Sequence, residues 1–216
     1  MTSLYSRSTS RLAQAWHALL VALSLAFWAA AAQAQSAPDP KAAPNDFVGA
    51  VANSTLEALK QDTGVKAGRM SDITRVVDKH VLPYVNLEKT TRLAAGQHWR
   101  SASASQRQQL VQAFKGTLLR TYGGAFSHLD SQSSFTMLPF RDDPKANDVV
   151  VRSSLSRSNG PAVNLNYRLE RTPEGWKIYD VNVEGIWLIQ NYRNQFAQEI
   201  TRNGVDGLIK TLNSQK

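Results

Sequence analysis

The spacing of apolar residues changes once along this chain, near Asp130, and this change restricts the possible folds more than any other feature of the sequence. Before Asp130, apolar residues recur every three to four positions, as in amphipathic helices. Beyond it they alternate with polar residues, as in half-buried strands. A chain that begins as helices and continues as sheet predicts an α+β fold, with a helical bundle packed on a small antiparallel sheet.

The helices are predicted from apolar spacing and from residues that begin or end helices. In the first part they are Asn45 to Lys60 behind an Asn45 cap, a helix capped by Ser71 and ended by Pro83, Leu87 to Ala95 ended by Gly96, and Ser103 to Phe126. Ser103 and Gln106 also match a capping box. After the strands, helical spacing returns in two segments that Gly204 separates, with Ile189, Tyr192, Phe196 and Ile200 in the first and Leu208, Ile209 and Leu212 in the second.

The strands are predicted from alternation and from a tight-turn signal, Thr172-Pro173-Glu174-Gly175. They cover Phe135 to Leu138, Val149 to Leu155, Val163 to Leu169 and Trp176 to Val183. Strict alternation in the last strand places Trp176 and Ile178 on one face and Tyr179, Val181 and Val183 on the other. The sheet is therefore expected to need apolar cover on both faces.

The N-terminal segment has the features of a secretory signal. Arg7 and Arg11 stand without an acidic residue before a mostly apolar stretch, Ala13 to Ala32, and Ala32-Gln33-Ala34 forms an A-x-A cleavage site. We expect a cleaved signal peptide over residues 1–34, with an uncleaved membrane anchor as the alternative. Residues 35–45, rich in Pro and Ala, predict a flexible leader, and residues 46–214 a single domain.

Composition excludes several classes of protein. The chain has no cysteine, which excludes disulfides, thiol catalysis and lipid attachment at a cysteine. The formal net charge is +8, and the segment from Lys60 to Arg120 holds eleven basic and four acidic residues. Such a segment suits nucleic acid, an anionic membrane or an acidic partner, or is simply a set of solvated helix faces. Export and the absence of a nucleic-acid-binding motif argue against nucleic acid.

Catalytic and metal-binding motifs are missing. The sequence has no G-x-S-x-G, H-E-x-x-H, P-loop or G-x-G-x-x-G, and its histidines are too scattered to predict a metal site. Asp180 and Glu184 are the best acid–base candidates, because a partly buried carboxylate at a strand end can have a raised pKa. The alternative is that they pair with Arg193 or cap the following helix.

A series of short motifs follows in a distinctive order: Leu93 to Arg100, Ser105-Gln106-Arg107 before Phe114, Thr121-Tyr122, Trp176 to Val181, Val183 to Ile186, Asn191 to Phe196, and Gly204 to Ile209. Together, from about Phe47 to Leu212, they resemble the MlaC or toluene-tolerance (Ttg2-type) family. Two departures are Trp187, where many members have Ser, and Ala95-Gly96-Gln97-His98-Trp99 in place of the usual L-G-x-x-W.

The resemblance implies a strongly curved sheet and helices that enclose a deep apolar pocket for acyl chains, with the headgroup near the mouth. It implies a monomeric periplasmic phospholipid carrier that maintains outer-membrane lipid asymmetry, is not an enzyme, and needs no cofactor besides its phospholipid cargo. The implied partners are an inner-membrane ABC transporter complex with a substrate-binding ring and an outer-membrane lipoprotein complex.

The predicted lipid-binding residues are large and apolar or amphipathic. They are Phe114, Leu118 and Tyr122 from the long helix, Val151, Tyr167 and Val181 from the sheet, and Ile186, Leu188 and Tyr192 after Glu184-Gly185. A place in the ordinary core stays open for each, because a core residue and a tail-lining residue have the same chemistry. Two other functions also stay open: an exported enzyme with a cone-shaped α+β pocket that uses Asp180 or Glu184, and an adaptor that acts through its surface alone.

Overall fold

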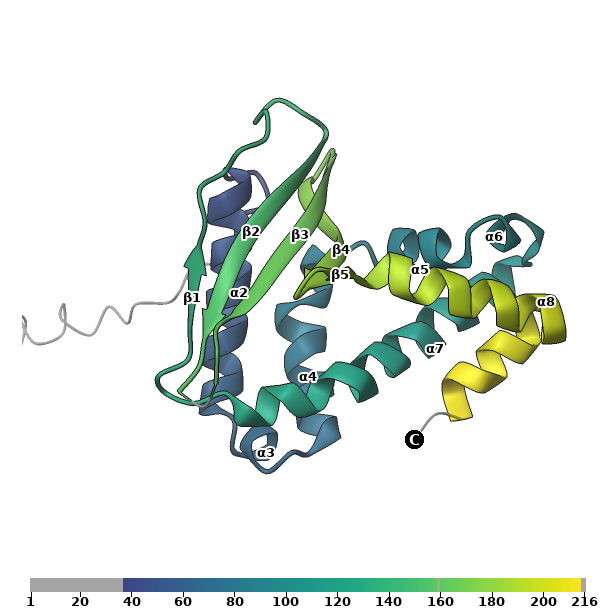
Figure 1. Cartoon of the computed structure of the whole chain (residues 1–216), viewed down its shortest axis with the longest axis horizontal. Coiled ribbons are helices and arrows are strands. Elements are labelled where there is room, and N and C mark those ends of the chain that lie inside the picture. The colour runs from purple at the N-terminus through teal and green to yellow at the C-terminus, as the bar shows by residue number, and fades with distance from the viewer. Residues whose placement is uncertain (1–36, 159, 215–216) are drawn as a thin grey trace, which may run out of the picture. The chain divides into compact units, whose positions relative to one another are not determined.

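The computed structural model describes residues 37–158 and 160–214, so the predicted signal peptide lies outside the described residues (Figure 1). The helices are α2 Pro44–Gln61, α3 Thr63–Lys66, α4 Met70–His80, α5 Leu87–Ala95, α6 His98–Ser101, α7 Ala104–Tyr122 and α8 Leu188–Ser214, with 3-10 helices η1 Leu82–Tyr84 and η2 Gly123–His128. The strands are β1 Ser134–Met137, β2 Asp148–Ser156, β3 Val163–Thr172, β4 Gly175–Val183 and β5 Ile186–Trp187. The predicted α+β class is confirmed.

Two of the predicted helix-end signals around the long helix and α5 are confirmed. The Ser103 hydroxyl accepts the backbone N–H of Gln106 at 3.1 Å, and the Gln106 side chain accepts the N–H of Ser103 at 2.9 Å, which completes the capping box. Gly96 ends α5 with a φ of 59°, a left-handed conformation that favours glycine. The long helix itself ends at Tyr122, and the chain continues as the 3-10 helix η2 rather than as α-helix to Phe126.

Two other predicted caps are wrong. Helix α2 begins at Pro44, whose missing N–H costs nothing in a first turn, and the Asn45 side chain instead donates to the carbonyl of Leu138 at 2.8 Å. Helix α4 begins at Met70, so Ser71 lies inside its first turn, and Arg69 occupies the N-cap position without a side-chain hydrogen bond to the helix. Ahead of α2, the carbonyl of Pro40 accepts the N–H of Trp176 at 2.7 Å.

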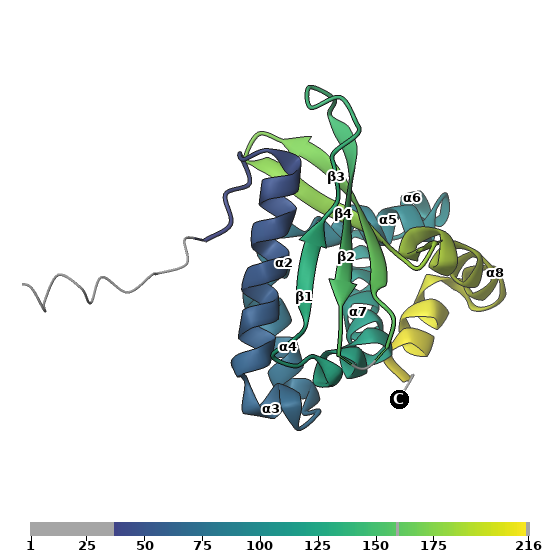
Figure 2. The same cartoon turned by 60° about the vertical axis from the view of Figure 1, so that its left-hand side comes forward.

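The sheet is antiparallel and follows chain order, β1-β2-β3-β4-β5 (Figures 1 and 2). The predicted turn at Thr172 to Gly175 joins β3 to β4, and the Thr172 hydroxyl donates to the carbonyl of Gly175 at 2.8 Å. The two-residue strand β5 was not predicted. Gly204 interrupts α8 with φ 72° and ψ −179°, which confirms the predicted break between two helical segments.

The predicted faces of β4 are wrong because the register shifts between Arg168 and Leu169. Leu169 pairs with Ile178 and Tyr167 with Val181, so β4 has one extra residue at this bulge. A bulge of this kind interrupts alternation along the strand that contains the extra residue. Val181 therefore shares a face with Ile178, and the sheet has one apolar face instead of two.

Buried apolar residues form three clusters instead of one core. The helical cluster joins α5, α6, α7 and α8, and contains Phe114, Tyr192, Phe196 and Leu212. The sheet cluster joins α2 to the sheet through Phe47, Val48, Val51, Val149, Val151, Leu169, Trp176 and Ile178. The α4 cluster joins the end of α2 to α3 and α4, and includes Leu56, Val65, Ile73 and Val76.

Candidate functional site

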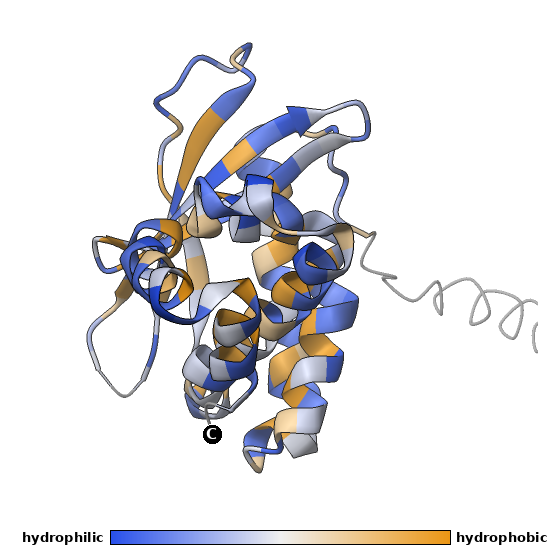
Figure 3. Cartoon of the chain, turned by 90° about the vertical axis from the view of Figure 1, so that its right-hand side faces the viewer, coloured by the Kyte–Doolittle hydropathy of each residue, from blue (hydrophilic) through white to orange (hydrophobic). Residues whose placement is uncertain are grey.

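The register of the sheet brings mostly apolar side chains together on one face across four strands, with Arg171 at its end, where the guanidinium lies 4.2 Å from the centre of the Trp176 ring. We call this face the apolar face. Its members are Phe135 and Met137 of β1, Val149, Val151, Ser153 and Leu155 of β2, Val163, Leu165, Tyr167 and Leu169 of β3, and Trp176, Ile178, Val181 and Val183 of β4. In the hydropathy colours of Figure 3 the alternation appears as orange and blue bands along the strands.

The opposite face is polar. The Asn166 amide donates to the Asn182 side chain at 3.3 Å, and Arg168 pairs with Asp180 at 3.2 Å. The Arg168 guanidinium also lies 4.0 Å from the centre of the Trp187 ring, a cation–π contact. A sheet with one polar and one apolar face requires cover on the apolar side only.

Helices cover the apolar face incompletely. The sheet cluster places α2 over one part of it, and Phe135 and Leu155 pack against the α4 cluster. Three further members, Val163, Leu165 and Val183, belong to none of the three clusters and are half-buried. This part of the apolar face lacks a complete apolar cover from the described residues.

Three of the predicted residues lie in a single row on this face. Val151 pairs with Tyr167, and Tyr167 pairs with Val181 on the next strand. Val151 is fully buried against α2, whereas Tyr167 and Val181 are half-buried at the margin of the sheet cluster. The structure thus brings these three together next to the incompletely covered region.

The predicted residues on the helices are divided between core and margin. Phe114 and Tyr192 are inside the helical cluster, with ring centres 4.8 Å apart, and are 0% and 6% exposed. Leu118 lies at the margin of that cluster, and Tyr122 one turn later is half-buried. Burial, with Tyr192 nearby, raises the pKa of the Tyr122 hydroxyl, so it stays neutral.

The remaining two predicted residues follow β4. Leu188 is half-buried at the start of α8. Ile186 is 59% exposed and pairs with Val183 across the turn, so it extends the apolar face to the edge of the sheet.

The three residues in the incompletely covered part of the apolar face, Val163, Leu165 and Val183, were not among the predicted lipid-binding residues. The clean alternation of β3 already contained a signal for the first two, because it places them on the same face as Tyr167. Val183 had the same signal, because alternation in its strand places it on one face with Val181. Only the pairing of the strands shows that Trp176 and Ile178 share this face.

Away from Arg171 at its end, the apolar face holds two hydroxyl groups that contact each other. The hydroxyls of Ser153 and Tyr167 lie 3.3 Å apart, at hydrogen-bonding distance. Burial raises the pKa of the Tyr167 hydroxyl, which keeps it protonated at neutral pH. A surface of this composition favours hydrocarbon over a polar substrate, because a polar group buried against it would lack hydrogen-bond partners.

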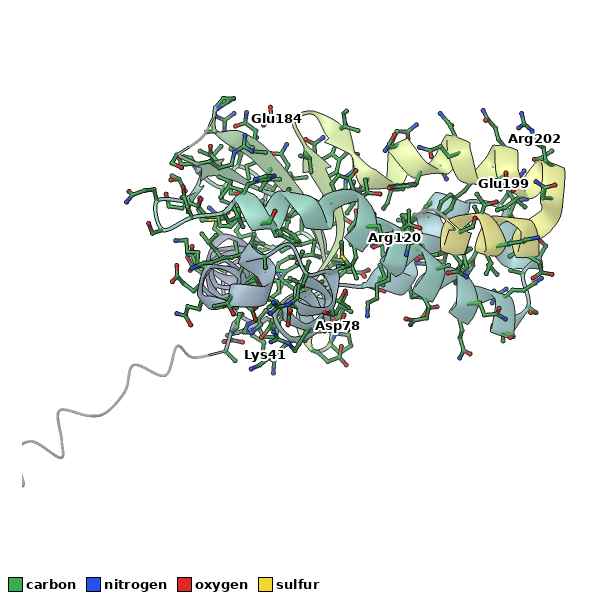
Figure 4. All side chains as sticks on the ribbon, turned by 90° about the horizontal axis from the view of Figure 1, so that it is seen from below. Lys41, Asp78, Arg120, Glu184, Glu199 and Arg202 are labelled. Carbon is green, nitrogen blue, oxygen red and sulfur yellow. The ribbon has the colours of Figure 1, made fainter. Side chains whose placement is uncertain are left out.

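The carboxylates of Asp180 and Glu184 are separated and differently engaged. The Asp180 side chain is fully buried; it accepts the N–H of Ile189 in the first turn of α8 at 3.1 Å and pairs with Arg168, not with Arg193. Burial raises the pKa of Asp180. Glu184 is exposed at the turn after β4, as Figure 4 shows, and accepts the backbone N–H of Asn164.

Two surface cavities lie away from the apolar face. One, of about 570 Å³, is lined by Glu57, Lys60, Lys66, Leu129, Asp130 and Ser131, and another, of about 250 Å³, by Ala58, Gln61, Asp62, Arg75, Val76, Lys79 and His80. Within residues 37–158 and 160–214, no three or more His, Asp or Glu side chains are grouped to hold a metal ion. In the same part of the chain, no helix has both the length and the apolar character needed to cross a bilayer.

Comparisons with known proteins agree with this architecture. A solved structure of a phospholipid-binding protein from Ralstonia solanacearum, in complex with a phospholipid, is 37% identical, has a TM-score of 0.75, and is matched over 80% of this chain and 95% of that one. The toluene tolerance protein Ttg2D of Pseudomonas putida is 28% identical over 171 residues, which is 78% of each chain. The intermembrane phospholipid transport system binding protein MlaC of Haemophilus influenzae is 25% identical over 140 residues, covering 62% of this chain and 64% of that protein. A sequence profile of the MlaC protein family matches residues 50–214, and the chain belongs to this family.

Proposed function

We propose that this chain binds a phospholipid by its acyl chains and carries it across the periplasm between membranes. The observation that carries the proposal is the incompletely covered apolar face of the sheet, where Leu165, Val183 and Tyr167 are half-buried and uncharged. A solved relative that is 37% identical holds a phospholipid, which supports the same class of ligand here.

The energetics favour this use of the apolar face. Each methylene that leaves water contributes about 0.8 kcal/mol, so a carrier for long acyl chains needs an apolar surface rather than a charged one. A headgroup left at the edge stays hydrated and needs no buried counter-charge. Ile186, exposed beside Val183, marks the edge of the apolar face that meets water, where a headgroup can stay hydrated.

The proposal includes a place in a transport system. As part of it, an inner-membrane ABC transporter complex with a substrate-binding ring and an outer-membrane lipoprotein complex exchange lipid with this chain, which acts as a monomer without cofactor or catalysis. The name of the Haemophilus influenzae relative, an intermembrane phospholipid transport system binding protein, supports this placement. Maintenance of outer-membrane lipid asymmetry is the corresponding cellular role.

Lipid extraction tests the proposal directly. Cells that express the full 216-residue chain are extracted without detergent, and the purified protein is analysed by native mass and by lipid mass spectrometry after solvent extraction. One phospholipid per chain is expected, and none on an unrelated exported protein prepared in parallel. A protein that is repeatedly empty and takes up no lipid from vesicles would overturn the proposal; turnover that depends on Asp180 or Glu184 would then favour an enzyme.

A matched pair of variants tests the apolar face. Val181→Arg places a charge on the apolar face, whereas Val150→Arg makes the same change on the opposite face of the sheet, since Val150 pairs with Arg168. We expect Val181→Arg to lose its lipid and Val150→Arg to keep it, with both circular dichroism spectra near wild type. A folded Val181→Arg protein with a full lipid load would remove this residue from the site. Val183→Arg, at a position outside the sheet cluster, repeats the test if Val181→Arg does not fold.

A further inference from the structure

Four arginines lie in or against the turn segment that joins α5 to α6. Two of them flank it in sequence: the carbonyl of Arg92 accepts the N–H of Gly96 at 3.0 Å, and the N–H of Arg100 donates to the carbonyl of Gln97 at 3.2 Å. Both side chains are exposed.

Two more arginines reach the same turn from other helices. Arg107, in the first turn of α7, donates to the carbonyls of Trp99 and Arg100 at 3.0 and 3.1 Å. Arg193 of α8 lies over Gly96, with its Nε 3.7 Å from the position that a Cβ would occupy there. We call this group the arginine patch: Arg92, Arg100, Arg107 and Arg193.

The charge of the patch is not compensated within the described residues. None of its four members forms an ion pair there, whereas Arg69, Arg75 and Lys115 of the same basic half each contact a carboxylate. On the neighbouring part of α8, Glu199 accepts hydrogen bonds from neutral side chains, and Arg202 projects outward beside it (Figure 4). Asp206 of α8 also lies at this end, where it accepts a hydrogen bond from Gln106 at 2.9 Å, so the four arginines of the patch and Arg202 outnumber the carboxylates of Glu199 and Asp206.

The patch has no apolar centre. Among the described residues, the exposed large apolar side chains are Met70, Leu138 and Ile186, and none of them belongs to this turn. Trp99 is only 7% exposed, and the Arg107 guanidinium lies 5.6 Å from its ring centre. Protein interfaces are usually centred on buried aromatic or aliphatic residues, which this surface does not offer.

We propose that the arginine patch docks the protein on the surface of an anionic phospholipid bilayer. Guanidinium groups bind phosphate oxygens through two parallel hydrogen bonds, and a bilayer presents many phosphates without requiring an apolar anchor. Each arginine near an anionic bilayer contributes about fivefold to the partition coefficient. The inference complements the proposed function but does not depend on it, because the patch can bind a bilayer whether or not the chain holds a lipid.

Vesicle sedimentation tests the proposal. The probes are vesicles of phosphatidylcholine alone and of equal parts phosphatidylcholine and phosphatidylglycerol, at low and high salt. The variant is Arg92→Gln/Arg193→Gln, and the matched control is Arg141→Gln/Lys145→Gln, which removes the same charge from exposed residues between β1 and β2. Arg92→Gln/Arg100→Gln replaces the first variant if the loss of Arg193 impairs folding.

Binding of the wild type to anionic vesicles is expected to weaken with salt, since exposed charges are screened. The double variant should bind roughly 25-fold more weakly and the control variant within a few fold of wild type. Equal binding of the two variants, or no preference of the wild type for anionic vesicles, would refute the proposal. Retention on immobilised polyglutamate without vesicle binding would instead assign the patch to an acidic protein partner. Lipid extraction of the same preparations distinguishes these results from a failure of the carrier function.

Discussion

Asp180 connects the sheet to the helix that follows it. Its carboxylate accepts the N–H of Ile189 at 3.1 Å and that of Val181 at 3.0 Å, and contacts Arg168 at 3.2 Å. Three roles were open for this residue from the sequence, namely catalysis, an ion pair with Arg193 and a cap for the next helix, and the structure shows the hydrogen bond to the helix. The predicted partner Arg193 was wrong, because Arg168 pairs with Asp180 across two adjacent strands.

We expect Asp180→Ala to destabilise the fold by about 1–3 kcal/mol, because the N–H of Ile189 loses its acceptor in a buried position. Asp180→Asn should cost less, since an amide oxygen can accept the same bond. Burial raises the pKa of Asp180, so the ionised carboxylate is disfavoured in the folded protein and its neutral replacement removes that cost. Arg168 loses its ionised partner in both variants, but its side chain is 39% exposed, so its charge stays solvated. Urea unfolding measures the free energy of unfolding of both variants. Equal losses of stability would contradict the role of the side-chain oxygen as acceptor for the N–H of Ile189.

At the scale of elements, the sequence indicated the break in α8 but not the bulge in β4. Gly204 indicated the break in α8 because a glycine between two apolar periods marks a helix end. The bulge in β4 had no comparable mark. Its extra residue is specified by the pairing of Leu169 with Ile178 and of Arg168 with Asp180, which are contacts between strands.

Gly204→Ala should destabilise the protein by about 1–3 kcal/mol, because φ 72° with ψ −179° is a conformation that almost only glycine adopts. No atom lies within 4 Å of the position that its Cβ would occupy, so the cost is conformational and not steric. Gly124→Ala is the matched control, since that site is equally open but does not have a positive φ. Thermal unfolding should place the control within about 0.5 kcal/mol of wild type. A Gly204→Ala protein as stable as the control would mean that α8 is not held at this kink.

At the scale of the whole molecule, the buried apolar side chains of the described residues form three clusters. Other apolar side chains lie at the margins of these clusters or belong to none of them. Leu118 borders the helical cluster, Leu119 the α4 cluster, and Val181 the sheet cluster. Val163, Leu165 and Val183 join none of the three. A bound acyl chain would supply contacts that the protein does not make to itself, so ligand and folding are expected to be coupled.

Removal of the bound lipid should therefore lower the melting temperature. A ligand at about a hundredfold above its Kd stabilises the folded state by about 2.7 kcal/mol. For a domain of this size that corresponds to roughly 5–10 °C in Tm. Calorimetry on extracted and lipid-reloaded protein measures the shift, with Val181→Arg as the variant expected to show none. Identical melting curves before and after extraction would argue against lipid as part of the apolar core.

The sequence by itself determined the class of fold, most helix and strand positions, the capping box at Ser103 and the turn at Thr172 to Gly175. These features depend on residues close together along the chain, which short-range periodicity and backbone preferences report. Only the tertiary structure decided that Val181 and Ile178 share a face and that Phe114 is core while Leu165 is half-buried. The physical reason is that register and cover are set by strand pairing and by helices packed from elsewhere in the chain, and an apolar side chain has the same chemistry in either place.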